Sequence, residues 1–125
     1  MNAPTVPVNL EAENKTIGCC FFDSTGETYL KVRQIVSPDD FYLFANQQVF
    51  KGLVKIYEEH STVDELLIAE YLNGLGTLEE VGGHTGLLGY TENIGSSLQA
   101  THFANIVREK SKLRQTIRAL SLIHI

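Results

Sequence analysis

The sequence lacks the features that mark a P-loop nucleotide hydrolase, a membrane-spanning helix or a secreted protein. It contains no Gly-Lys pair, so it cannot form the glycine-rich loop whose lysine reaches the phosphates of a bound nucleotide. No apolar run approaches the ~20 residues that cross a bilayer. The N-terminal residues lack the basic start and the apolar stretch of a secretory signal. We therefore expect no nucleotide-hydrolysing site, no membrane anchor and no secretion.

Cysteine is scarce, because only Cys19 and Cys20 are present and they are adjacent. Neighbouring residues of a helix point in different directions, so a bond between these two sulfur atoms would be strained. We expect two reduced, partly buried thiols, which is the usual state of cysteine in the cytoplasm. The sequence thus indicates a cytoplasmic protein.

Metal-binding and catalytic patterns are also missing. The four histidines stand far apart, with no cysteine or carboxylate at the spacing of a metal site. A catalytic carboxylate pair must face a substrate from opposite sides, whereas adjacent acids at helix ends are typical of caps and solvated faces. The adjacent pairs here are Asp39-Asp40, Glu58-Glu59 and Glu79-Glu80. We predict no catalytic residue, no cofactor-binding residue and no metal ligand in this chain.

The net charge of −5 is unevenly distributed. Residues 1–107 hold 14 acidic and 5 basic residues, a charge of −9, and residues 108–125 hold 5 basic residues and Glu109, a charge of +4. An acidic body is a poor surface for duplex DNA, which is bound first through its phosphates, so proteins are the favoured partners. The basic residues are solvated flanks, a contact for an acidic protein or a contact for nucleic acid. They are Arg108, Lys110, Lys112, Arg114 and Arg118.

Helical periodicity runs through the chain, and no alternating strand pattern or hairpin turn interrupts it. Asn9 and Asp64 are suited to cap the helices that follow them, and Gly18 can let another helix approach closely. The apolar face of the strongest helix comprises Val49, Phe50, Leu53, Val54 and Tyr57. The predicted helices are about 10–22, 27–35, 45–59, 65–72 and a short one near 87–94. The fold should be all-α.

The last segment has a narrower apolar pattern than a core helix. Its members are Phe103, Ile106, Lys110, Leu113, Ile117 and Leu120, spaced three and four residues apart with one polar exception. Spacing alone fits a core helix of a bundle and a two-per-heptad seam equally well. The sequence ends before a further helix covers this seam, and an uncovered apolar stripe needs a partner. We therefore favour a contact with another chain or a further segment.

Several short motifs occur in a characteristic order. Leu10-Glu11-Ala12-Glu13 is followed by Ile17-Gly18, Asp40-Phe41-Tyr42 and Gln47-Gln48-Val49-Phe50, then by Val63-Asp64, Leu78-Glu79-Glu80-Val81-Gly82-Gly83 and the segment 103–110. This ordered set, over about residues 7 to 120, resembles the N-terminal part of bacterial and phage replicative DNA helicases of the DnaB family.

The resemblance implies a compact multi-helix head followed by the first arm of a helical hairpin that pairs with a neighbouring subunit. In that family the paired domains form a collar on a hexameric ring and bind primase and a helicase loader. ATP, Mg²⁺ and most DNA contacts belong to a motor domain that is absent here. On this mapping Phe103, Ile106, Leu113, Ile117 and Leu120 form the hairpin or dimer interface, and the basic residues 108–118 are candidate partner contacts.

The same mapping divides the chain into four parts. We expect a flexible N-terminal tail over 1–8, the helical head over 9–98, the first hairpin arm over 99–120, and a fragment end or non-native residues over 121–125. Three positions depart from the family pattern. Ala45 stands where proline is frequent, Asn46 where histidine is common, and Gly86 where an aromatic residue is frequent.

Two other functions remain open from the sequence. The chain could be a stand-alone helical adaptor, such as a helicase loader or a primase-binding factor. It could also be a helix-turn-helix DNA binder that uses the basic segment 108–118, although the acidic body disfavours this interpretation.

Overall fold

The structure is a computed structural model that describes residues 6–123, and within that range it contains helices and loops but no strand. The predicted all-α fold is confirmed. Six α-helices and two short 3₁₀ turns follow one another along the described chain: α1 (Leu10–Phe22), α2 (Glu27–Arg33), η1 (Pro38–Asp40), α3 (Phe44–His60), α4 (Glu65–Leu75), η2 (Glu79–Val81), α5 (Gly83–Gly89) and α6 (Ala100–Ile123).

The helix ends follow from capping chemistry. The Asn9 side chain accepts a 2.9 Å hydrogen bond from the Ala12 amide, and Asp64 accepts bonds from the first-turn amides of α4, so both predicted caps are confirmed. α4 runs three residues past the predicted end at residue 72. It ends only at Gly76, whose φ of +78° reverses the chain direction and is a conformation that glycine adopts without strain.

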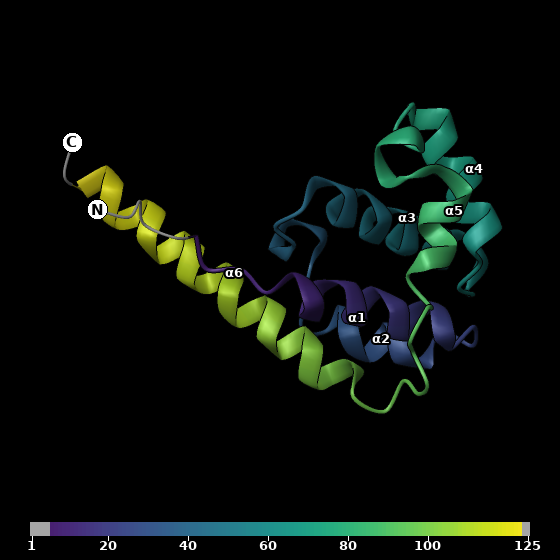
Figure 1. Ribbon diagram of the computed structural model, residues 1–125, viewed down its shortest axis with the longest axis horizontal. Helices are drawn as coiled ribbons and strands as arrows, with labels where there is room; N and C mark the ends of the chain where they lie inside the picture. The colour runs from purple at the N-terminus through teal and green to yellow at the C-terminus, as the bar shows by residue number, and fades with distance from the viewer. Residues whose placement is uncertain (1–5, 124–125) are drawn as a thin grey trace.

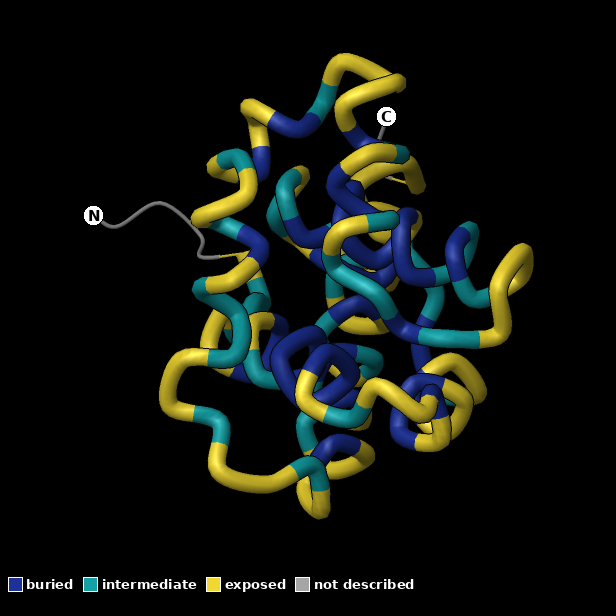
Figure 2. Tube along the Cα trace, turned by 90° about the vertical axis from the view of Figure 1, so that its right-hand side faces the viewer, coloured by how far each residue is buried: buried dark blue, intermediate teal, exposed yellow. Residues whose placement is uncertain are grey.

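α1 lies at the centre of the head and packs against α2, α3 and α6. Its residues Ile17, Cys19 and Cys20 are fully buried, so the two thiols are more buried than predicted. Leu10, the first residue of the helix, is 41% exposed. Figure 2 shows that buried residues gather where the head helices face one another.

α3 supplies the largest side chains of the core. Val49, Phe50 and Leu53 are buried as predicted, and the ring of Phe50 lies 5.0 Å from that of Phe41, centroid to centroid. Aromatic pairs at this separation add to the stabilisation that comes from burial of their apolar area. Gly52 lets α4 approach, because a Cβ there would lie 2.8 Å from Ile68 Cγ2.

Gly18 permits a close approach, but the segment that comes near it is not a helix. A Cβ at Gly18 would meet the Tyr90 carbonyl oxygen and would lie 3.0 Å from Ile94 Cγ1. Both residues belong to the turn that follows α5. The glycine therefore fixes the path by which the chain returns from α5 across α1 to the start of α6.

α6 is the longest helix, and Figure 1 shows it extending past the head. Its first turns are part of the core, where Ala100, Ala104, Val107 and Ser111 are buried. Within residues 6–123, no helix combines the length and the apolar character needed to cross a membrane.

The proposed division into head and hairpin arm stays a prediction. Most of the predicted tail, residues 1–5, lies outside the described residues, and so do residues 124–125 of the segment expected to be a fragment end. Residues 6–9 precede the first helix, and α6 continues through residues 121–123.

Candidate interaction surface

α6 carries two different faces. The predicted seam begins with Phe103 and Ile106, which are partly buried against the core. Further along, Leu113, Ile117 and Leu120 are 43%, 50% and 52% exposed. The structure therefore brings the first two apolar residues of the seam onto the head and leaves its last three uncovered within the described chain.

The fully buried face of α6 is a second stripe, which the sequence analysis missed. It consists of Ala100, Ala104, Val107 and Ser111, each small or of moderate size. Their spacing of four, three and four residues is as regular as that of the seam, so the signal was present. A search for large apolar residues does not select alanine and serine. Their small size, however, lets α6 lie close to α1.

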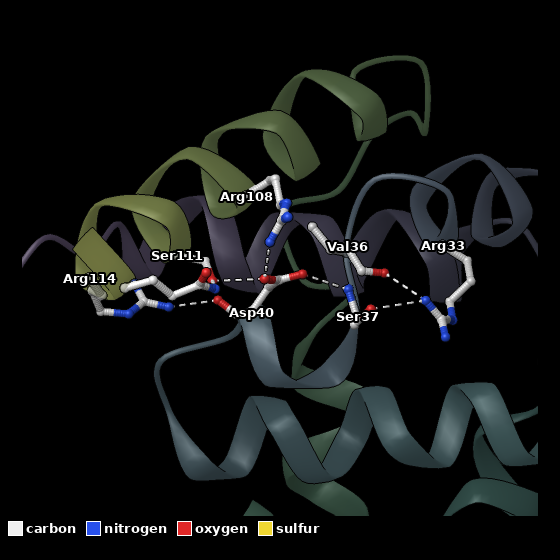
Figure 3. Close-up of polar contacts among 8 residues, drawn as sticks. Arg33, Val36, Ser37, Asp40, Arg108, Ser111 and Arg114 are labelled. Carbon is white, nitrogen blue, oxygen red and sulfur yellow. Dashed lines mark hydrogen bonds and ion pairs between the residues drawn. The ribbon is translucent and has the colours of Figure 1, made fainter. Parts of the chain in front are cut away.

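Asp40 is the polar centre that attaches α6 to the head. Its carboxylate is buried and accepts hydrogen bonds from Arg108 Nη1 at 2.9 Å and from Ser111 Oγ at 2.7 Å. The other carboxylate oxygen accepts from the Ser37 amide at 2.8 Å, which closes a capping box over η1. Figure 3 shows these groups converging on Asp40 from α6 and from the turn. A buried charge is tolerated because each oxygen has partners.

Arg114 makes a second attachment one turn further along α6. Its guanidinium donates to the Asp40 carbonyl oxygen at 2.7 Å and to the Pro7 carbonyl oxygen at 2.9 Å. It also lies over the ring of Tyr42, with the guanidinium carbon 5.5 Å from the ring centroid. Arg114 thus joins α6, η1 and the N-terminal segment, and these contacts hold the helix in one direction.

A groove of about 490 Å³ opens beside this attachment and borders the uncovered seam. It is lined by Val6, Pro7, Asp39, Phe41, Tyr42, Gln47, Arg114, Ile117 and Arg118. Of the predicted partner contacts, Arg108 and Arg114 donate hydrogen bonds within the chain. Lys112 and Arg118 are exposed and Lys110 is half-buried, so these three present charge beside the seam.

A second buried carboxylate holds the start of α3. Glu13 accepts a hydrogen bond from the Tyr42 amide at 2.7 Å and from Asn46 Nδ2 at 2.9 Å. Glu13 also accepts from the amide of Leu43, the N-cap residue of α3, at 3.4 Å, so this carboxylate from α1 holds the residues that lead into a helix with no side-chain cap of its own. Asn46 Oδ1 in turn accepts from the Tyr90 hydroxyl at 2.6 Å, and burial together with the Glu13 charge raises the pKa of Tyr90.

The three departures noted in the sequence all border one cavity of about 650 Å³ between α1, α3 and α5. Ala45 and Asn46 come from the start of α3, and Gly86 comes from α5. A Cβ at Gly86 would meet the Val81 carbonyl oxygen, so the local backbone admits only glycine without a shift. Asn46 fits because its amide donates and accepts at once.

The adjacent acid pairs lie at helix ends and turns. Asp40 caps η1, while Glu58, Glu59, Glu79 and Glu80 are exposed at helix ends and turns. Among residues 6–123 there is no group of three or more histidine, cysteine, aspartate or glutamate side chains placed to hold a metal ion.

Comparison with known proteins identifies relatives along almost the whole chain. The chain is 29% identical over 123 residues to the replicative DNA helicase DnaC of Bacillus subtilis, covering 98% of this chain and 27% of that protein. It is 30% identical over 117 residues to the replicative DNA helicase DnaB of Geobacillus stearothermophilus, covering 94% of this chain and 25% of that protein. The chain thus spans about a quarter of the length of these relatives.

The fold has a solved counterpart. The crystal structure of the N-terminal domain of DnaB helicase from Mycobacterium tuberculosis superposes with a TM-score of 0.87 at 26% identity, covering 95% of this chain and 85% of that one. A family model, the DnaB-like helicase N terminal domain, matches residues 5–109. The predicted resemblance is confirmed, and the chain belongs to the family of DnaB-like helicase N-terminal domains.

Proposed function

We propose that this chain is the collar domain of a hexameric replicative DNA helicase, where it pairs subunits and binds primase or a helicase loader. Membership of the family supports the assignment to a replicative helicase. The unwinding of DNA, with ATP and Mg²⁺, then belongs to another domain of the whole protein, which acts in the cytoplasm. This role needs no catalytic residue in the present chain.

The observation that carries the pairing role is the uncovered half of α6. Leu113, Ile117 and Leu120 are each about half exposed on one stripe of a helix whose direction is fixed by Asp40 and Arg114. Full burial of one such side chain stabilises a contact by about 1.5–3 kcal/mol, so an interface that covers three of them gains several kcal/mol. A second helix laid along this stripe, from a further segment or a paired subunit, provides that burial.

The basic residues beside the stripe support a protein partner better than DNA. Arg108 and Arg114 donate their hydrogen bonds to Asp40, so they are not held ready for phosphate groups. Lys112 and Arg118 remain exposed, which is a smaller positive surface than a recognition helix needs. The family match likewise favours a helicase domain over a stand-alone adaptor.

The full product of the gene that encodes this domain provides the test. We expect a hexamer by light scattering, and we expect Ile117→Lys with Leu120→Lys to shift the population to smaller species. Leu75→Lys is the matched control, because Leu75 is 54% exposed on α4 and lies far from the stripe in sequence. If the double variant still forms the hexamer, α6 is not part of the interface. Hydrolysis of ATP by the pure 125-residue chain would contradict the non-catalytic assignment.

A further inference from the structure

The charge of the head is concentrated in one continuous stretch of sequence. From residue 56 to residue 107 there is no lysine or arginine, and the same stretch holds eight acidic residues: Glu58, Glu59, Asp64, Glu65, Glu70, Glu79, Glu80 and Glu92. The middle of this stretch forms α4, η2 and α5, which we call the acidic lobe, whereas Glu58 and Glu59 belong to the end of α3 and Glu92 follows α5. A surface with charges of one sign attracts and orients partners of the opposite sign.

The acidic lobe also contains an apolar pocket between α4 and α5. Its volume is about 240 Å³, and it is lined by Glu65, Leu66, His84, Leu87 and Leu88. Leu87 is 1% exposed and belongs to the core, whereas Leu66 and Leu88 are 61% and 60% exposed at the rim. Single exposed leucines scattered over a surface are common and need no explanation. Two strongly exposed leucines that border the same pocket form a joint apolar surface, which is typical of an interaction site.

The elements that carry the pocket are fixed in place. α4 and α5 pack against each other, and Figure 1 shows them at the end of the molecule away from the free end of α6. The Asp64 side chain caps the first turn of α4, directly before Glu65 and Leu66. On α5, His84 and Leu88 are four residues apart and so share one helix face. The pocket exists before a partner arrives, which lowers the entropic cost of binding.

The pocket size and the lobe charge define what fits. Small-molecule sites measure about 300–1,000 Å³, so a hollow of this size suits one side chain of a protein better than a whole ligand. DNA, RNA and anionic membranes carry the same sign of charge as the lobe and are repelled. Glu65 lines the pocket, and Glu70 lies four residues after Leu66 and so shares its helix face, where both acids can pair with lysine or arginine.

We propose that the groove between α4 and α5 binds a basic amphipathic helix of a partner protein. One leucine or similar side chain of that helix enters the pocket between Leu66 and Leu88, and lysine or arginine residues on its flanks face Glu65 and Glu70. This is the helix-in-groove mode of recognition, with charge setting the partner and its orientation. The surface is separate from the stripe on α6, so the inference does not depend on the pairing role.

The probe is a labelled synthetic helix with leucines on one face and lysines on its flanks, titrated with the full 125-residue chain and followed by fluorescence anisotropy. We expect Leu88→Ser and Leu66→Ser to weaken binding about tenfold each, as expected for loss of an aliphatic anchor contact. Leu75→Ser is the matched control, being an exposed leucine of α4 that does not line the pocket, and it should leave the affinity within about twofold.

Two further probes separate the groove from charge attraction alone. A peptide with the same lysines and serine in place of leucine should bind at least about tenfold more weakly to the unaltered chain. A peptide with glutamate in place of lysine should not bind. Equal binding of the serine peptide, or equal losses in Leu88→Ser and Leu75→Ser, would overturn the proposal. So would self-association of the chain that Leu88→Ser abolishes, because the groove would then belong to a second copy.

Discussion

The two halves of α6 differ in what holds them. The first half contributes Ala104, Val107 and Ser111 to the core and is attached through Asp40. The second half has no buried residue after Ser111, and its leucine and isoleucine side chains are between 43% and 75% exposed. One continuous helix therefore has an end that is packed against its own chain and an end whose apolar area is uncovered within the described residues.

The difference shows how a rigid interaction element is built in a small domain. A helix that projects from a head needs a firm base, because any rocking at the base is amplified at the free end. Here the base combines buried small residues with a carboxylate whose oxygens accept three hydrogen bonds. Substitutions at the base should lower the free energy of unfolding. Substitutions at the free end should weaken the proposed assembly and leave the free energy of unfolding nearly unchanged.

The largest effect is expected at Asp40. Asp40→Ala removes the acceptor of Arg108, Ser111 and the Ser37 amide. We expect the free energy of unfolding to fall by about 3 kcal/mol, because the buried Ser111 hydroxyl and two part-buried donors lose their acceptor. Urea denaturation followed by circular dichroism measures the change. The neighbouring Asp39→Ala is the control, since Asp39 is exposed and should change stability by less than about 0.5 kcal/mol. Equal effects of the two variants would refute the role of Asp40.

The next largest effect compares the two halves directly. Val107→Ala removes two methyl groups from a side chain that is 1% exposed, and we expect a loss of about 2 kcal/mol of unfolding free energy. Ile117→Ala removes more apolar atoms from the uncovered half and should cost less than about 0.5 kcal/mol in this chain. Thermal unfolding of the two variants in the same buffer gives both values. A larger cost for Ile117→Ala would reverse the comparison.

The buried cysteines report on the base of α6 independently of global unfolding. Cys19 Sγ lies 3.7 Å from the Ser96 carbonyl oxygen, in the segment that leads into α6, and burial raises the pKa of both thiols. Since the thiolate is the reactive form, labelling by a disulfide reagent at pH 8 should be slow in the native chain. Val107→Ala should speed labelling by about tenfold or more, in proportion to its effect on opening, and Ile117→Ala should not. Rapid labelling of the unaltered chain would contradict the observed burial.

Much of this fold could be predicted, and the failures have a common physical cause. Asn9 and Asp64 were identified as caps because the capping atoms and the amides they bind are close in sequence. The confirmed core of α3 followed from the periodicity of large apolar residues such as Phe50 and Leu53. The family assignment rested on the order of short motifs and is confirmed by the family match.

What the sequence could not predict are the contacts between distant residues. Glu13 accepts from the Tyr42 amide, 29 residues away in sequence, and Asp40 accepts from Arg108, 68 residues away. Both acids stand in the short motifs of the sequence, but the motifs do not reveal the distant donors, because a carboxylate near a helix end is usually solvated. The pocket between α4 and α5 is likewise formed by two short apolar segments. The turn at Gly76 and η2 bring these segments side by side.

A smaller effect is expected from Arg114→Lys. Lysine keeps the positive charge but cannot bond to both the Asp40 and Pro7 carbonyl oxygens in the fixed geometry of a guanidinium group. We expect a loss of about 1 kcal/mol in unfolding free energy, together with faster proteolytic cleavage in residues 6–9. Arg118→Lys is the control on the exposed side of the same helix. If both variants behave alike, Arg114 does not hold the N-terminal segment.

The smallest effect on folding is expected at the free end of α6, and it gives the comparison its sharpest test. Leu120→Ser changes a side chain that is 52% exposed and has no buried neighbour in its helix, so the unfolding free energy should change by less than about 0.5 kcal/mol. If α6 pairs subunits as proposed, the same variant in the whole gene product should weaken that pairing, because an apolar contact is lost. A folding cost above about 1 kcal/mol in the 125-residue chain would mean that this half of α6 packs on its own head in solution, and the free end would then be unavailable to a partner.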